Sequence, residues 1–167
     1  MHCFVGTKML AILFATVAVV GSAAQDQDAA GRDQGRPKCK SVHADMVENR
    51  STTACRPGHP ACFLGEVDGN HGLRGTTYFR GDSGGGSPPT SPEFSSYSGV
   101  FEYSTSRGII IARETGVTSS TFGVVTAYQR ITEATGEFAG VTGHFFVNGF
   151  LGGGRVVTTV AGEICYP

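Results

Sequence analysis

The stretch 122–131 has the sequence FGVVTAYQRI, and its middle alternates between two sets of side chains. Even positions from 124 to 130 carry Val, Thr, Tyr and Arg, whereas odd positions from 125 to 131 carry Val, Ala, Gln and Ile. An alternation of period two is typical of a β-strand that presents chemically different faces. Segments with strand character recur at short spacing from residue 63 onward, which is the pattern of an all-β domain.

Seven other segments have strand character and are separated by turn residues. They cover 40–46, 63–67, 73–79, 97–103, 109–114, 144–150 and 156–165. Together with 122–131 they predict an all-β fold: a closed antiparallel barrel of about eight strands, because closure removes exposed sheet edges. Glycine makes up 25 of the 167 residues, about twice its average share, which favours short strands joined by tight turns. Such a barrel encloses just enough space for filling side chains or for one small ligand.

The first 24 residues have the features of a signal peptide. Lys8 ends a short basic region, Met9–Val20 is an apolar run, and the small residues GSAA at 21–24 precede an expected cleavage before Gln25. A membrane anchor is disfavoured because the run is shorter than the roughly 20 apolar residues needed to span a bilayer. We therefore expect a secreted protein, extracellular or, in a host with an outer membrane, periplasmic.

The mature chain is long enough for one domain with its own core. We expect a disordered polar leader over 25–38 and the β-barrel domain over 39–167, with 81–92 as a flexible Gly/Ser/Pro loop. Loss of Lys8 leaves 12 of the 13 basic residues against 14 acidic ones, a formal charge of −2. This balance, without a basic block, argues against nucleic acid as a partner and against membrane contact after signal cleavage. The sequence indicates no cofactor and does not define an oligomeric state.

Four cysteines remain after signal cleavage, and an even number in an exported chain predicts disulfides. Of the three possible pairings we favour Cys55–Cys62, which closes a turn-rich stretch, together with Cys39–Cys165, which ties the ends of the domain. The alternative is a zinc site made of Cys55, His59 and Cys62. It is disfavoured because thiols in an oxidising compartment pair before they meet metal, so no metal site is predicted.

The segment 130–143, RITEATGEFAGVTG, resembles the I-x-G-G-T-G-x-F-x-G-x-x-G segment of allene oxide cyclases and dirigent proteins. The chain looks closer still to small secreted bacterial proteins of the same barrel superfamily. They share its C-terminal GEIC with a final proline, and an early Cys…Pro-Ala-Cys stretch followed by a hairpin. The resemblance covers roughly residues 39–167 and implies a barrel. One difference is that Glu133 and Ala134 replace the family's paired glycine, so the first turn is expected to differ.

The residues of this motif have structural roles. Gly136, Gly140 and Gly143 permit backbone angles that other residues avoid, and Phe138 is suited to plug a barrel end. Allene oxide cyclases position a bound water and a glutamate in an apolar barrel cavity, but the motif does not place these catalytic residues on this chain. The resemblance therefore implies the fold rather than an activity.

Charged residues on the predicted strands are candidates for chemistry, because alternation sends some of them into the barrel, where burial raises a carboxyl pKa. The leading hypothesis is a catalytic group of Glu114, which ends the run IIIARE, with Tyr128 and Arg130 lining the same opening. For each candidate, exposure on the outer surface is the commoner outcome. The further candidates are Glu66, Glu102, Arg113 and Glu163.

The segment GDSGG at 81–85 matches the nucleophile segment of chymotrypsin-like proteases letter for letter. That chemistry needs a histidine base and an acid that orients it. His43 lacks the sequence context of such a base, too few residues precede Ser83 for two barrels, and the segment runs into a Gly/Pro-rich loop. We therefore reject the serine protease interpretation.

Three classes of function remain. The first is a non-catalytic barrel that binds a small apolar ligand or a surface partner, and it ranks highest. The second is an allene oxide cyclase-like or dirigent-like isomerase or cyclase, which requires a dry pocket with an inward carboxylate. The third is a structural protein whose barrel is filled. An empty apolar cavity favours the first, an apolar cavity with buried polar groups the second, and a filled interior the third. The aromatic residues that would either line a cavity or fill a core are Phe101, Tyr103, Phe122, Phe138, Phe145, Phe146 and Phe150.

Overall fold

The computed structural model describes residues 37–167. The predicted signal peptide and almost all of the predicted leader lie outside these residues. In the described part, order begins with a strand at Lys38, close to the predicted domain start at residue 39. No helix among the described residues has the length and apolar character needed to cross a membrane.

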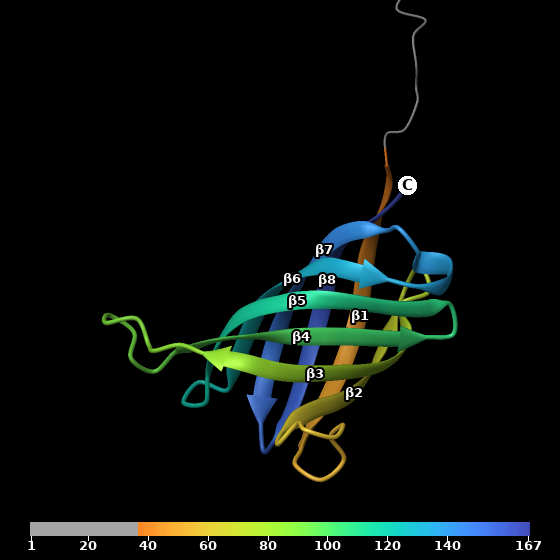
Figure 1. Cartoon of the computed structure of the whole chain (residues 1–167). Helices are drawn as coiled ribbons and strands as arrows, with labels where there is room; N and C mark the ends of the chain where they lie inside the picture. Colours follow the sequence, from red (N-terminus) through yellow and green to blue (C-terminus); the bar gives the residue numbers. More distant parts are fainter. Residues whose placement is uncertain (1–36) are drawn as a thin grey trace, which may run out of the picture. The chain divides into compact units, whose positions relative to one another are not determined.

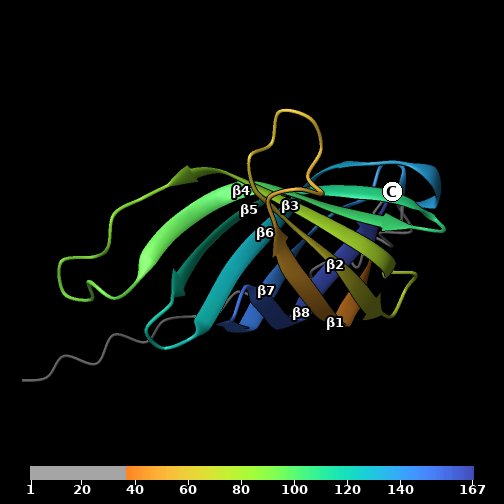
Figure 2. The same ribbon diagram turned by 90° about the horizontal axis from the view of Figure 1, so that it is seen from below.

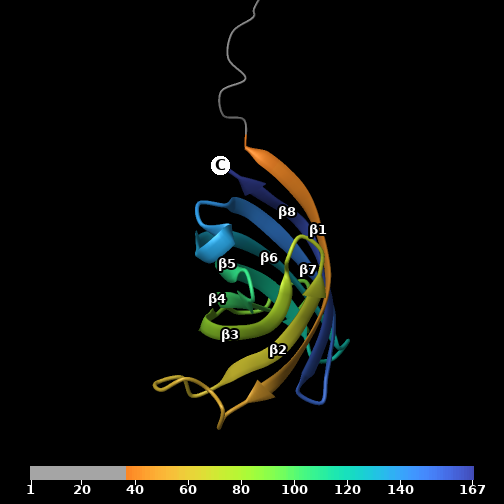
Figure 3. The same ribbon diagram turned by 90° about the vertical axis from the view of Figure 1, so that its right-hand side faces the viewer.

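Eight antiparallel strands form one closed barrel, which confirms the predicted fold class (Figure 1). Each strand pairs with the next one along the chain, and β1 also pairs with β8, so that the sheet has no free edge. Figure 2 and Figure 3 show the strands curving around this common interior. The strands are β1 (Lys38–Ser51), β2 (Cys62–Gly69), β3 (Arg74–Gly84), β4 (Ser95–Thr105), β5 (Gly108–Ser119), β6 (Val124–Ala134), β7 (Thr142–Gly152) and β8 (Arg155–Tyr166).

The interior is built from alternate residues of each strand. In β1, for example, Val42, Ala44 and Met46 are buried while the residues between them are exposed. One half of the barrel is filled by large aromatic side chains that are almost completely inaccessible. They are Phe101, Tyr103, Phe138 and Phe145.

Phe138 plugs the filled half, as the sequence motif predicts. It lies in the short 3-10 helix η1 (Gly136–Phe138) between β6 and β7, and it is 0% exposed. Gly136 has a φ of +64°, and a Cβ there would approach the Arg107 carbonyl oxygen to 2.4 Å. Any larger residue at this position would displace the turn that carries the plug. Glu133 and Ala134, which replace the family's paired glycine, continue β6 and pair with β5 beside a register shift.

Two boundaries differ from the predicted ones. β1 continues to Ser51 rather than ending near Met46, because both of its neighbours remain paired with it. β3 continues to Gly84, so Gly81, Ser83 and Gly84 of the predicted flexible loop pair with β4, with a register shift between Gly81 and Ser83. The prediction weighted the glycine content of this segment and missed its pairing partner.

Both predicted disulfides are present. Cys39 and Cys165 are direct partners in the β1–β8 ladder and lie 126 residues apart in sequence. Cys55–Cys62 closes the connection between β1 and β2 over a separation of 7. The alternative zinc site at Cys55, His59 and Cys62 is therefore wrong, because both sulfur atoms are engaged in the disulfide.

The two disulfides should differ in their contribution to stability. In the chain-entropy description, a crosslink stabilises more when it closes a longer loop, which gives about 5 kcal/mol for Cys39–Cys165 and about 2.5 kcal/mol for Cys55–Cys62. Replacing both cysteines of the first pair by serine should therefore lower the free energy of unfolding more than the same change in the second pair. Urea unfolding of the two double variants measures the difference, and equal losses would contradict it.

Candidate functional site

The half of the barrel opposite the aromatic plug contains a cavity of about 220 Å³. Part of its wall is half-exposed, so it reaches the barrel end that carries the β1–β2, β3–β4, β5–β6 and β7–β8 connections. Most of the wall is apolar. The lining residues are Met46, Glu48, Phe63, Phe79, Gly81, Tyr97, Glu114, Thr118, Val125, Val147, Leu151, Val156 and Thr158.

Inward-facing glycines make room for the side chains around this cavity. A Cβ at Gly65 would lie 2.6 Å from Glu48 Cγ, and a Cβ at Gly116 would lie 2.7 Å from the Tyr97 hydroxyl oxygen. These distances are shorter than any real contact. The backbone at both glycines therefore provides the space that the two polar side chains occupy.

Two carboxyl groups line the cavity, and each is only 5% exposed. Glu48 comes from β1 and Glu114 from β5, which are four strands apart in either direction around the closed barrel. The two carboxyls therefore reach the cavity from opposite walls. Among the described residues that line the cavity, none is basic, so no cation compensates the two acids.

Glu114 is held by neutral hydrogen-bond donors. The Gln129 amide donates to Glu114 Oε2 at 2.5 Å, and the Tyr103 hydroxyl donates to Gln129 Oε1 at 2.5 Å, which orients that amide. Burial raises the pKa of Glu114, while the interactions with Gln129 and with the Tyr97 hydroxyl oppose this rise. The ionised form of Glu114 is thus supported from two sides.

Glu48 has much less support for its charged form. Its one recorded side-chain partner in the described chain is the Thr77 hydroxyl, which donates to Oε1 at 3.3 Å. Burial, and then repulsion from Glu114, raise the pKa of Glu48 from 4.5 to about 8. Burial raises the pKa of both acids, but the donors on Glu114 favour its carboxylate more than the single Thr77 hydroxyl favours that of Glu48. The site therefore contains two buried acids in unequal hydrogen-bonding environments.

Thr158 is a further polar residue of the cavity lining, and its hydroxyl has no hydrogen-bond partner among the described residues. Its side chain lines the cavity from β8, and the residue is 4% exposed. A buried hydroxyl without a partner costs roughly 1–3 kcal/mol. This cost is part of the structure of the cavity wall.

The structure separates the three residues of the leading sequence hypothesis. Glu114 points into the barrel as expected, whereas Tyr128 is 42% exposed and Arg130 also lies on the outer surface. The predicted common neighbourhood is therefore wrong. In the β5–β6 ladder Glu114 stands opposite Gln129, and directly opposed residues share a face, so Gln129 takes the place that the hypothesis gave to its neighbours.

The other charged candidates all lie on the outside. Glu66 is exposed, and Glu102 forms a bidentate ion pair with Arg56, which belongs to the disulfide-closed connection. Arg113 pairs with Asp82. Glu163 lies 3.7 Å from the His144 ring nitrogen. These contacts stabilise the surface of the barrel and do not reach the cavity.

The aromatic candidates divide in the same way. Phe101, Tyr103, Phe138 and Phe145 fill the core, so none of them lines the cavity. Phe122, Phe146 and Phe150 are exposed. Phe146 packs on the outer surface with Tyr128 and His144, where nothing in the structure shows what covers it.

Sequence reasoning missed Glu48, Tyr97, Gln129 and Thr158. Glu48 continues the buried series of Val42, Ala44 and Met46 with period two, so extending the predicted strand by two residues would have found it. Gln129 belongs to the same alternating set as Ala127 and Ile131. Because these two residues are apolar, the pattern indicates that Gln129 also faces inward.

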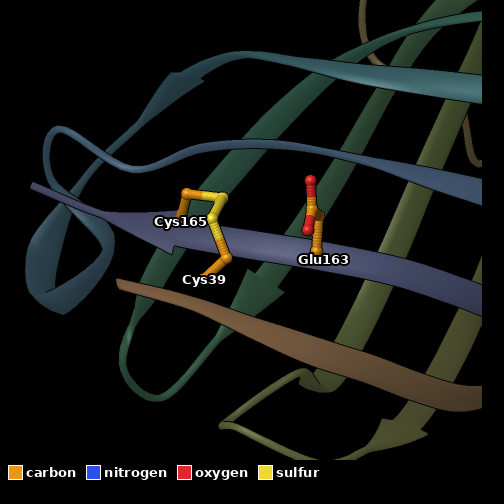
Figure 4. Close-up of side chains that lie close together, drawn as sticks. All are labelled: Cys39, Glu163 and Cys165. Carbon is orange, nitrogen blue, oxygen red and sulfur yellow. A yellow bond between two sulfur atoms is a disulfide. The ribbon is translucent and has the colours of Figure 1, made fainter. Parts of the chain in front are cut away.

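Other sites suggested by residue types are occupied by structural contacts. In the described chain, Cys39, Glu163 and Cys165 are the one group with three potential metal-ligand atoms close together. The two sulfurs are bonded to each other, and Glu163 stands on the same strand as Cys165 (Figure 4). Ser83 of the GDSGG segment is within 2.8 Å of the Ser98 hydroxyl. Its hydrogen-bond partner is thus a serine rather than a histidine, consistent with rejecting the protease interpretation.

No protein-family model matches this chain, and no curated protein matches it.

The raised pKa of Glu48 makes a prediction about stability and pH. The carboxyl is ionised above about pH 4.5 in the unfolded chain but stays protonated to about pH 8 in the folded one. Stability should therefore fall as the pH rises through this window, by about 1.4 kcal/mol per pKa unit of the shift. Glu48→Gln should remove much of this fall, as measured by urea unfolding at several pH values.

The matched control for this prediction is Glu66→Gln, which changes an exposed carboxyl on β2. It should leave the pH dependence of the free energy of unfolding unchanged. A Glu48→Gln variant with the same decline as the wild type would contradict the prediction.

Proposed function

We propose that this protein is a container that binds one small, mainly apolar molecule in the barrel cavity. The observation that carries the proposal is an unfilled, mainly apolar space of about 220 Å³ inside the barrel. A filled barrel has no such space, so the structural class of function has less support. With the signal peptide expected over 1–24, the proposed container is a secreted one.

The size of the cavity limits its occupant. A cavity of roughly 150 Å³ lined by apolar residues binds benzene, and this one measures about 220 Å³. A ring compound of one or two small rings therefore fits, whereas a long-chain lipid does not. The half-exposed residues Phe63, Leu151 and Val156 mark the side from which the molecule enters.

The charge of the cavity limits the occupant further. Because the described lining residues include two acids and no basic residue, a ligand with its own carboxylate or phosphate would find no opposite charge in the cavity. The ligand is therefore neutral or cationic, with an apolar body and at least one polar atom that reaches the inner groups.

A second candidate function is supported by the same cavity. Buried polar groups in an apolar pocket are what an isomerase or cyclase of the allene oxide cyclase or dirigent kind requires. The observation that favours it is the pair of carboxyls on opposite walls, Glu48 and Glu114. A container for a neutral ligand gains no charge attraction from two buried acids.

Binding can be tested with indole, a neutral bicyclic probe. The chain has no tryptophan, so the fluorescence of bound indole is free of tryptophan background. Two neighbouring valines of β8 offer a matched pair of variants: Val156 lines the cavity, whereas Val157 is exposed. Val156→Phe should weaken indole binding about tenfold or more by filling the cavity, and Val157→Phe should change it less than about twofold.

Thermal unfolding of both phenylalanine variants confirms that they fold before binding is compared. Absence of indole binding by the wild type, or equal weakening by the two variants, would contradict binding inside the barrel.

A further inference from the structure

We infer that the cavity is a proton-transfer site for a small ketone, with Glu114 as the base and Glu48 as the acid that holds the carbonyl oxygen. This inference rests on the proposed function, because it requires that a small neutral molecule enters the cavity. It adds a substrate class and an activity to the binding already proposed.

The placement of the two carboxyls carries the inference. Glu48 on β1 and Glu114 on β5 face the cavity from opposite walls, so an occupant lies between them. A base on one side and an acid on the other is the arrangement that removes a proton from one atom while charge develops on another. Thr158 is a third polar residue of the lining and stands on β8, the strand beside the β1 of Glu48.

The environments of the two acids assign their roles. Glu114 accepts a hydrogen bond from Gln129 and is contacted by the Tyr97 hydroxyl, which both favour its carboxylate. Among residues 37–167, the Thr77 hydroxyl is the side-chain donor to Glu48. When neighbouring surroundings drive the pKa values of two acids apart, the lower one serves as base and the higher one as acid.

The titratable group that acts on Glu48 is another acid. Burial, and then Glu114, raise the pKa of Glu48, and burial followed by both acids raises the pKa values of Tyr97 and Tyr103. The cavity lining in the described chain contains no basic side chain that would ionise Glu48 at neutral pH. Its carboxyl therefore keeps its proton and donates a hydrogen bond.

The reaction balances without any co-reactant. Glu114 takes a proton from the carbon next to the carbonyl, so a C–H bond breaks and its electron pair forms a carbon–carbon double bond. The carbonyl π pair moves to the oxygen, which receives a proton from Glu48. Return of a proton from Glu114 to the same carbon, or to a conjugated one, restores a ketone, and Glu48 regains its proton. The outcome is hydrogen exchange or the shift of a double bond.

The substrate class follows from the same groups. A carbonyl oxygen accepts from Glu48, while an apolar ring contacts residues such as Val147 and Val125. A carboxylic acid of the same size would be repelled by Glu114. The expected substrate is thus a neutral cyclic ketone.

Cyclohexanone in D₂O is the probe for this activity, and proton NMR follows deuterium incorporation beside its carbonyl. The full chain with both disulfides should accelerate exchange above the buffer rate. Glu114→Gln should lower the protein-dependent rate by about a hundredfold or more, because it removes the base. Glu66→Gln, an exposed change on β2, should leave the rate unaltered.

A pH profile distinguishes a chemical role of Glu48 from a structural one. The wild-type rate should fall above about pH 8, where Glu48 loses its proton. Glu48→Gln should lower the turnover rate by about tenfold or more and abolish this fall, since the amide donates a hydrogen bond but does not titrate. Its affinity for the ketone should change less than its turnover.

Ketone binding is measured separately, by displacement of indole. If cyclohexanone displaces indole but its hydrogens exchange at the buffer rate, the proton-transfer inference is overturned, whereas the proposed binding function is retained. Failure of both molecules to bind would overturn both proposals. If Glu114→Gln does not fold, as judged by thermal unfolding and indole binding, the Glu48→Gln pH profile decides: an unchanged profile overturns the inference.

Discussion

The pairing of β1 with β8 is the interaction on which the rest of the structure depends. It runs from Lys38–Tyr166 to Asn49–Arg155 and is bonded covalently at Cys39–Cys165. Once this ladder closes the sheet, every strand directs alternate residues to a common interior. Polar residues at inward positions are therefore buried in the barrel together with the apolar ones. Closure thus explains why Glu48 and Glu114 are buried, although polar residues follow both of them in the sequence.

The interior is divided because its two halves are filled differently. Aromatic side chains, together with the plug Phe138, occupy one half. In the other half, glycines occupy inward positions of β2 and β5, and their missing side chains leave room for polar groups from neighbouring strands. A closed barrel of eight strands has a fixed internal volume. The distribution of large and small residues along the strands therefore decides where space remains, and here it remains at the end opposite the plug.

Much of the fold could be predicted from the sequence, because it depends on local patterns. The strand segments, their order and the two disulfides follow from alternation, glycine-rich turns and the cysteine positions, and Phe138 plugs the barrel as its motif indicated. The site was predicted only in part. Glu114 faces the interior as predicted, but the hypothesis names Tyr128 and Arg130 and leaves out Gln129, although its apolar neighbours in the alternating set, Ala127 and Ile131, indicate the inward face. Which residues face each other across the barrel depends on the strand register, because a shift of one residue exchanges the inward-facing and outward-facing side chains of a strand.

A chain of hydrogen bonds links the filled half of the barrel to Glu114 in the cavity. Tyr103 belongs to the filled half and packs against Phe101 and Phe145. Its hydroxyl reaches Gln129, whose amide in turn holds Glu114 at the edge of the cavity. A side chain fixed by packing therefore orients the carboxylate, whereas Glu48 on the opposite wall lacks such a relay. The difference between the two acids thus originates in the core, where a side chain fixed by packing orients a donor toward Glu114.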